Sequence, residues 1–207
     1  MPIYDHLSSR TGDRTEASNR AVAAQCLAEP ALLADVAEGL RDKDARLAGD
    51  CAEVMTQVAS EQPSLVLPYA DALLALLDHP ATRTRWEAAH ALSLIAAWIP
   101  DSIGTSLPTL VRHIRTDTSV IVRDYAVDCL SSYADAGQEQ ARAVYPILVE
   151  CLSRWEGKQA GHALPGLERV ARRLPELADA IRALAQDQLE HPRAVVRKAA
   201  KRLLRTL

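Results

Sequence analysis

The 207-residue chain contains no Phe, and aromatic residues make up only 4% of it, although 48% of its residues are hydrophobic. Its core must therefore consist of Leu, Ala, Val and Ile, side chains that suit high helix propensity and close helix packing. No apolar run approaches the roughly 20 residues that a membrane span requires. The composition thus favours a helical protein and excludes a membrane-spanning segment.

Signals for export and for metal binding are also missing. The N-terminus lacks the basic start and apolar middle of a secretory signal, so we expect a cytoplasmic protein. The cysteines have no close Cys or His partner at metal-ligand spacing; they are Cys26, Cys51, Cys129 and Cys151. We expect reduced thiols in the core. A disulfide between Cys129 and Cys151, on neighbouring predicted helices, stays open.

Motifs of catalysis are absent as well. There is no nucleophile motif, and Gly157-Lys158 lacks the spacing of a phosphate-binding loop. Glu87 and His90 are three residues apart, the spacing of helical di-iron ligands, but the required second pair does not exist. We therefore expect no metal, no cofactor and no enzymatic activity.

What the chain does contain is an internal repeat. Five times, at nearly equal intervals, a basic residue is followed three positions later by Ala or Gly; the basic residues are Arg46, Arg85, Arg123, Lys158 and Arg197. A period of about 40 residues, with sequence for two helices in each repeat, indicates a helical solenoid. Solenoids present extended surfaces, so the expected function is binding.

Apolar spacing predicts the helices of each repeat. In the second repeat a first helix spans 63–77, Pro80 breaks the chain in the turn at 78–82, and a second helix spans about 84–98. The same pattern predicts helices at 30–40, 46–59, 106–114, 120–134, 140–152, 174–189 and 194–207, with an extra helix at 13–29. In the fourth repeat Gly and Pro residues crowd positions 157–166, where we expect a bent or broken second helix. Residues 1–12 are predicted to be a flexible tail.

These repeats resemble the HEAT-repeat family over about residues 14–207. Repeats of that family carry a Pro in the first helix, an Asp in the turn and a Val-Arg pair at the start of the second helix. The matching residues are Pro68, Pro108 and Pro146; Asp42, Asp78 and Asp117; and Val122-Arg123 and Val196-Arg197. Lys158, Thr84 and Glu190 depart from the pattern. The resemblance implies an all-α fold, a right-handed α-α superhelix of the HEAT/ARM-like solenoid type. We expect about five two-helix repeats plus an N-terminal capping helix, forming a single domain over 13–207.

The arginines near the start of the second helices are expected to be structural. An Arg at this place can reach the Asp of a neighbouring turn and so link repeats. Arg46, Arg85, Arg123 and Arg197 would take this role.

The second helices should together present one face to a partner. Positions one and five residues after each basic mark share a helix face. They give a predicted partner-binding set on the concave side, consisting of Trp86, His90, Asp124, Asp128, Gln159, Lys198 and Arg202. Trp86 would be the anchor, because exposed Trp is enriched at binding hot spots; the alternative is a Trp packed between adjacent repeats.

Charge is unevenly distributed along the chain. Residues 1–150 hold 12 Lys and Arg against 21 Asp and Glu, whereas residues 151–207 hold 12 against 6. A basic patch lies near the C-terminus, formed by Arg193, Arg197, Lys198, Lys201, Arg202 and Arg205. It suits phosphates of nucleic acid, or it is the polar outer face that a terminal repeat needs.

The sequence therefore predicts a non-catalytic, monomeric protein–protein interaction module that binds a protein or peptide through its concave face. One alternative is a nucleic-acid binder that uses the basic patch. A second alternative is an enzyme of the HEAT-like lyase or DNA glycosylase type, to which Trp86, Asp124 and Asp128 could be fitted. The acidic character of residues 1–150 fits that alternative badly. Nothing in the spacing of solenoid residues names the partner.

Overall fold

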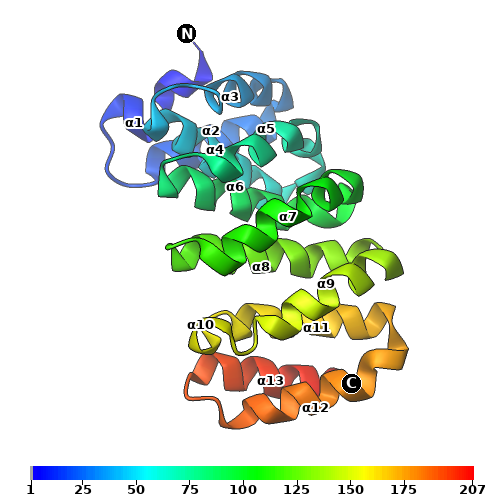
Figure 1. Ribbon diagram of the computed structural model, residues 1–207. Coiled ribbons are helices and arrows are strands. Elements are labelled where there is room, and N and C mark those ends of the chain that lie inside the picture. The colour runs from blue at the N-terminus through cyan, green and yellow to red at the C-terminus, as the bar shows by residue number, and fades with distance from the viewer. Residues whose placement is uncertain (1) are drawn as a thin grey trace. The chain divides into compact units, whose positions relative to one another are not determined.

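The computed structural model describes residues 2–207, which are 84% helical and contain no β-strand. The chain forms two compact units, a first that ends at Ser102 and a second that spans Ile103–Leu207. Each unit consists of helices packed in pairs (Figure 1). We describe the two units separately.

The first unit is organised around one long helix that is buried over most of its length. Its α-helices are α1 (Ser8–Thr11), α2 (Ala17–Ala28), α3 (Leu33–Gly39), α4 (Ala45–Glu61), α5 (Ala70–Ala75) and α6 (Thr82–Ile95). Helix α4 packs against α2, α3 and α6, and α5 packs against α6. The side chain of Asp44 accepts a hydrogen bond from the amide of Arg46, which fixes the start of α4. Helices α4 and α6 are thus the second helices of consecutive repeats.

Prolines shorten the first helices of this unit. The predicted helix at 63–77 is observed as two 3₁₀ turns, Pro63–Leu65 and Leu67–Tyr69, followed by α5 and a third 3₁₀ turn, Leu76–Asp78. Pro63 and Pro68 lack the amide hydrogen that an α-helix needs, so the chain coils more tightly around them. The first repeat begins in the same way, with a 3₁₀ turn at Pro30–Leu32.

The N-terminal residues differ from the flexible tail expected over 1–12. Ile3–His6 is a 3₁₀ turn and is followed by α1. Leu7 is fully buried, and the amide of Ser8 donates to Asn19 Oδ1 at 2.9 Å. The short apolar stretch thus covers helices α2 and α4, a contact that helical periodicity does not reveal in so short a segment. Met1 lies outside the described residues.

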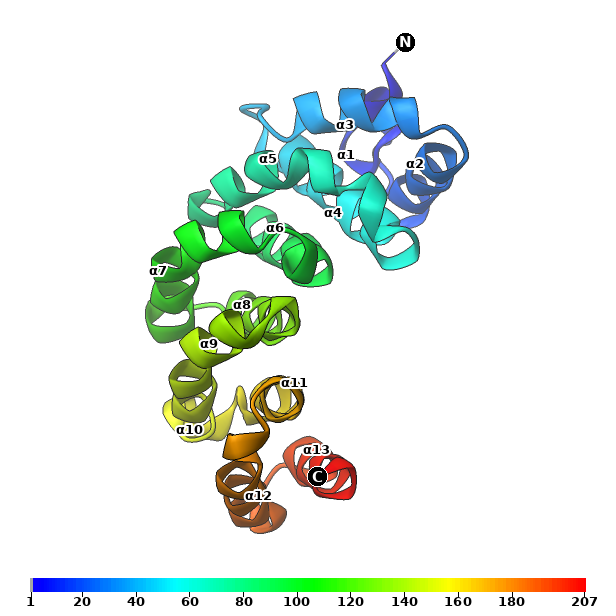
Figure 2. The ribbon, with the colours of Figure 1, turned by 90° about the vertical axis from the view of Figure 1, so that its right-hand side faces the viewer.

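The second unit contains two rows of helices. Helix α7 (Pro100–Thr116) begins just before it, and the others are α8 (Val120–Tyr133), α9 (Gln138–Glu150), α10 (Arg154–Gly157), α11 (Ala160–Arg173), α12 (Ala178–Asp187) and α13 (Ala194–Thr206). Helix α11 packs between α8 and α13, and α9 and α12 lie in the other row (Figure 2). Helices α8, α11 and α13 are the second helices of three consecutive repeats.

The irregularity expected in the fourth repeat lies before its second helix. Trp155 and Glu156 have left-handed backbones, with φ of 52° and 59°, so α10 is a kinked turn. Helix α11 then begins at Ala160 and continues through Pro165. The irregular backbone is thus confined to the turn between α9 and α11. Helix α11, which packs against α8 and α13, is continuous.

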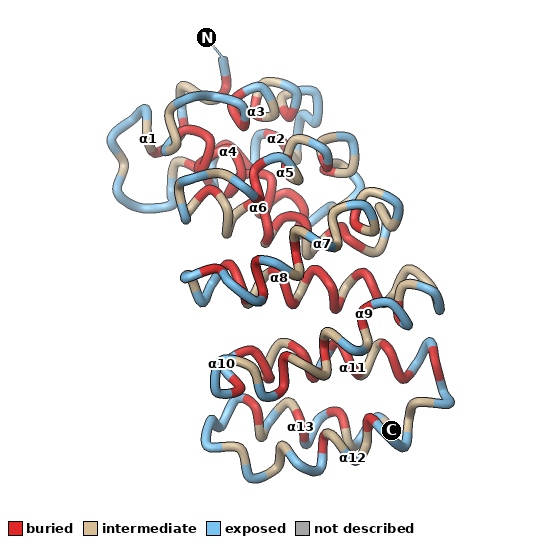
Figure 3. Tube along the Cα trace, in the orientation of Figure 1, coloured by how far each residue is buried: buried red, intermediate tan, exposed pale blue. Residues whose placement is uncertain are grey.

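The core is aliphatic, as the composition predicts. Buried residues line the inner sides of the helices in both units (Figure 3). All four cysteines are buried and free, so no disulfide joins Cys129 to Cys151. None of the described helices is long and apolar enough to cross a membrane.

Candidate functional site

The second helices of the second unit carry a titratable pair on their shared face. His162 on α11 lies with its Nδ1 2.9 Å from Asp128 Oδ1 of α8, and its Nε2 lies 3.7 Å from Asp124 Oδ2. The hydrogen bond to Asp128 raises the pKa of His162, with a further contribution from the charge of Asp124. Burial raises the pKa of Asp124, against the opposing hydrogen bond from Gln159. The sequence reasoning identified both aspartates but missed His162.

Gln159 holds Asp124 from inside the protein. Its Nε2 donates to Asp124 Oδ1 at 3.0 Å, and the residue is only 1% exposed. Its Oε1 is buried without a hydrogen-bond partner. Gln159 was predicted to face a partner, but its burial leaves it no surface for contact.

A groove lies between α11 and α13, with a volume of about 730 Å³. Pro165 and Glu168 line it from α11, and α13 contributes Ala194, Val195, Arg197, Lys198, Ala199, Lys201, Arg202 and Arg205. Five of the six residues of the predicted basic patch therefore meet in one depression. The sixth, Arg193, instead donates to the carbonyl oxygen of Lys158 at 2.6 Å.

The corresponding face of the first unit holds Trp86 and His90, both half-buried on α6. The indole Nε1 of Trp86 donates to Glu87 Oε1 at 2.7 Å. Burial raises the pKa of Glu87 to about 7 in spite of that hydrogen bond. A carboxyl group that is half protonated near neutral pH can accept or donate a proton.

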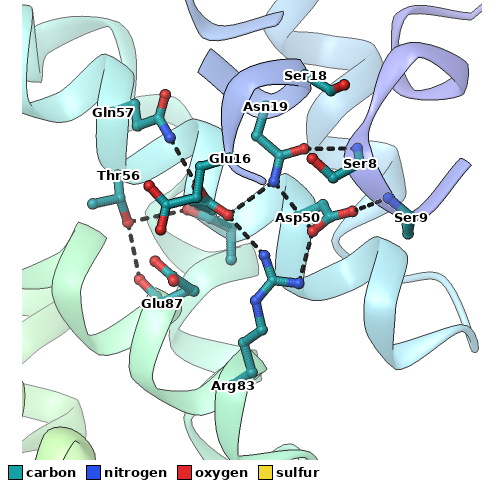
Figure 4. A network of polar contacts seen from close by, with 12 residues as sticks. Ser8, Ser9, Glu16, Ser18, Asn19, Asp50, Thr56, Gln57, Arg83 and Glu87 are labelled. Carbon is teal, nitrogen blue, oxygen red and sulfur yellow. Dashed lines mark hydrogen bonds and ion pairs between the residues drawn. The ribbon is translucent and has the colours of Figure 1, made fainter. Parts of the chain in front are cut away.

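A network of buried polar groups lies beside this face (Figure 4). Arg83 pairs with Asp50 at 2.7 Å and with Glu53 at 2.7 Å. Asn19 Nδ2 donates to the same two carboxylates, at 3.1 and 2.8 Å. Burial raises the pKa of Asp50, but hydrogen bonds from Ser9, Arg83 and Asn19 outweigh it and hold the pKa below its ordinary value. The network joins α2, α4 and α6 and is structural.

The arginines at the helix starts act within their own repeats. Arg197 Nη1 donates to the carbonyl oxygens of His191 and Pro192, at 2.7 and 2.8 Å. Arg123 donates to Asp117 O at 2.6 Å, and Arg85 donates to His79 O and Pro80 O. The sequence predicted the Asp of a neighbouring turn as the partner, whereas the carbonyl oxygens that these arginines bind belong to the turn before their own helix. Arg46 is different, since its side chain is 84% exposed and lies 3.9 Å from Asp44.

Trp155 is a second residue that the sequence reasoning missed. Its ring lies over the guanidinium of Arg123, 4.1 Å from ring centre to carbon, and its Nε1 donates to Ile114 O at 3.1 Å. These contacts hold the left-handed turn between α9 and α11. The two glycines near it in the sequence signalled irregular backbone but gave no indication of a cation–π contact.

The cysteine thiols and the possible metal ligands are the remaining candidates for reactive groups. Burial raises the pKa of Cys26 to about 11 and that of Cys51, Cys129 and Cys151 to about 12, so the thiols stay protonated. Among residues 2–207 no three His, Cys, Asp or Glu side chains are arranged to hold a metal ion.

No protein-family model and no curated protein matches the chain. Solved structures do match it. One is the designed armadillo repeat protein YIII(Dq)4CqI, with a TM-score of 0.71, 19% identity, and coverage of 99% of this chain and 98% of the other. A second is the designed armadillo repeat protein YIII(Dq.V1)4CPAF in complex with the peptide (KR)4, with a TM-score of 0.72, 19% identity, and coverage of 99% and 97%.

A natural protein matches as well. Kap121p bound to Ste12p has a TM-score of 0.72 and 17% identity; the match covers 98% of this chain and 22% of Kap121p. At these identities the likeness concerns the fold alone. The fold is that of a HEAT/armadillo-like α-solenoid, which confirms the class expected from the repeat period.

Proposed function

We propose that this protein is a non-catalytic module that binds a protein or peptide through the exposed face of its second helices. The observation that carries the proposal is the groove between α11 and α13, where side chains of two successive second helices form a depression of about 730 Å³. Grooves between stacked repeats are the surfaces that solenoids offer to extended partners. Two of the matching structures are complexes with a peptide or a protein, which supports the same mode here.

Each unit contributes its own part of the predicted face. In the second unit Asp128, Lys198 and Arg202 have exposed or half-exposed side chains. In the first unit Trp86 and His90 remain the predicted contacts, with Trp86 as the anchor. Gln159 is assigned a supporting role beneath Asp124 instead of a direct contact. The monomeric state and the cytoplasmic location stay predictions of the sequence.

The test is a selection from a displayed library of random peptides on the immobilised full chain. Selected peptides are then measured by fluorescence anisotropy against Asp128→Ala, Lys198→Ala and Trp86→Ala. Arg142→Ala on α9 is the matched control, because Arg142 is exposed in the other row of helices. We expect at least one face substitution to weaken binding about tenfold, as the loss of a contact worth about 1.4 kcal/mol would, and the control to leave binding unchanged.

Two results would overturn the proposal. One is the absence of any peptide enriched above the unselected library. The other is a set of peptides whose binding depends on Arg142 and not on the second-helix residues.

A further inference from the structure

The groove between α11 and α13 has an unusual balance of charge. Arg197, Lys198, Lys201, Arg202 and Arg205 line it, and Glu168 is its one carboxylate. Arg202 Nε lies 4.0 Å from Glu168 Oε2, at the limit of an ion pair, and Arg197 is held by the carbonyls of its own turn. Within residues 2–207 the side chains of Lys198, Lys201 and Arg205 have no hydrogen bond or ion pair.

The clustering of Lys and Arg side chains on one face of α13 destabilises that helix. Arg197 and Lys201, Lys198 and Arg202, and Lys201 and Arg205 are like-charged pairs four residues apart, and such pairs repel on a helix surface. A cap that serves only solubility would place its charges on the side of α13 turned away from α11. These five side chains instead line the depression that α13 shares with α11. An anionic ligand seated there would relieve the repulsion.

The rest of the lining distinguishes between anionic ligands. Pro165, Ala194, Val195 and Ala199 give the groove an apolar part, and the side chain of Val195 is 56% exposed. Among residues 2–207 no aromatic side chain lines the groove, which therefore offers no platform there on which bases could stack. From Arg197 to Arg205 the cations span about 12 Å along the helix, which is the length of about two turns of a peptide helix.

Resting on the proposed protein-binding function, we infer that the groove binds an acidic segment of a partner protein that also carries aliphatic side chains. Its carboxylates pair with Lys198, Lys201 and Arg205, and an aliphatic side chain covers Val195. Charge complementarity raises the association rate and gives specificity, and burial of the apolar part of the groove adds affinity.

The experiment measures fluorescence anisotropy of labelled probes with the full chain. The main probe is a peptide of repeated Glu-Glu-Leu triplets, about four triplets long to span the groove. Comparison probes are the same length of Lys-Lys-Leu triplets, a Glu-only peptide, and single-stranded oligothymidylate. The variants are Lys198→Glu with Lys201→Glu, and Val195→Asp. The matched control is Arg142→Glu with Arg172→Glu, two exposed arginines outside the groove.

We expect the Glu-Glu-Leu peptide to bind more tightly than every other probe. The double groove variant should weaken its binding about tenfold or more, and added salt should weaken it in the native protein. Val195→Asp should remove the advantage of Glu-Glu-Leu over the Glu-only peptide, and the control variant should change nothing. Circular dichroism of each variant checks that the helices remain folded, and Lys198→Gln with Lys201→Gln should give a smaller loss.

Three results would overturn the inference. Oligothymidylate that binds as tightly as the acidic peptide, with the same dependence on Lys198 and Lys201, would make the groove a nucleic-acid site. Equal losses in the groove and control variants would make the attraction non-specific. Absence of acidic-peptide binding, while a peptide selected from the random library still binds, would reject the acidic partner and leave the proposed function standing.

Discussion

Both units link the second helices of successive repeats through polar side chains, but they use different chemistry. In the first unit Arg83 of α6 pairs with Asp50 and Glu53 of α4, whose side chains are 1% and 8% exposed. In the second unit His162 of α11 pairs with Asp128 of α8, and these side chains are 38% and 33% exposed. A guanidinium keeps its charge at any physiological pH, whereas an imidazole titrates near neutrality. The first link is therefore permanent and the second depends on pH.

Burial decides how much each link matters. Carboxylates removed from water need a cation and hydrogen bonds to remain ionised, so losing the cation leaves a charge without compensation. A half-exposed pair retains water as an alternative partner, and its loss costs less. The comparison predicts large effects in the first unit and small, pH-dependent effects in the second.

The largest expected effect is that of Arg83→Ala. It leaves Asp50 and Glu53 buried without their guanidinium, and breaking a buried pair in this way costs about 3–5 kcal/mol. Urea unfolding of the full chain at neutral pH, followed by circular dichroism, measures the loss. Arg20→Ala is the control, because Arg20 and its partner Glu16 are 69% and 62% exposed; its loss should stay within about 0.5 kcal/mol. Equal losses for the two variants would contradict the ranking by burial.

The next effect concerns Glu87. Burial raises the pKa of Glu87 from 4.5 to about 7. Between these two pH values the folded state therefore keeps a proton on Glu87 that the unfolded state has released. Stability from this group is complete below pH 4.5 and is lost as the pH rises to about 7. We expect Glu87→Gln to be more stable than the native protein at pH 8 by about 2–3 kcal/mol.

Urea unfolding at pH 4.5 and pH 8 measures this difference. The gain of the Gln variant should vanish at the lower pH, where native Glu87 is protonated. A gain of the same size at both values would show that burial does not disfavour the Glu87 carboxylate.

The sequence predicted the helices of the fold well because their signal is repeated five times. An apolar stripe that recurs in every repeat is strong evidence for a helix. The second helices α4, α6, α8 and α13 accordingly lie within a few residues of their predicted ranges. The first helix at 63–77 was predicted too long, because proline changes the coil locally to 3₁₀ geometry without disturbing the apolar spacing. The one at 106–114 was predicted too short, since α7 spans Pro100–Thr116. The segment 3–11 was missed because two short turns carry no periodicity.

The candidate site was less accessible to sequence reasoning. The basic patch was visible as a run of Lys and Arg, but whether it faced α11 or solvent depends on packing. His162 was missed since its partners are 34 and 38 residues away in sequence, and fixed offsets from the basic marks do not reach it. Gln159 was predicted at the surface because the offset rule ignores the irregular chain that precedes α11.

In the second unit the stability of the contact between α11 and its neighbours should depend on close packing, whereas the contact between α4 and α6 in the first unit depends on ion pairs. A Cβ added at Gly166 of α11 would lie 2.4 Å from Ser131 Oγ and 2.9 Å from Leu148 Cδ1. Gly166→Ala should therefore destabilise the protein by about 1–3 kcal/mol through overpacking. Gly161→Ala on the same helix is the matched control, since its Cβ would meet only Val195 and Val196 methyl groups at 3.7 Å or more. Urea unfolding that ranks Gly161→Ala as the more harmful change would contradict the packing argument.

The smallest effect is the pH response of the His162 link. The pKa of His162 is raised from 6.5, mainly by its hydrogen bond to Asp128, so its contribution to stability is complete below pH 6.5 and is lost as the pH rises through the folded-state value. Asp124 adds to this attraction and Arg193 opposes it. Because the pair is half-exposed, we expect a contribution of only about 0.5 kcal/mol. Urea unfolding of His162→Gln should show that loss at pH 5.5 and almost none at pH 8.5, whereas exposed His6→Gln should show none at either pH. A loss for His162→Gln that is equal at both values would mean that the imidazole acts in its neutral form, and the second link would then be as insensitive to pH as the first.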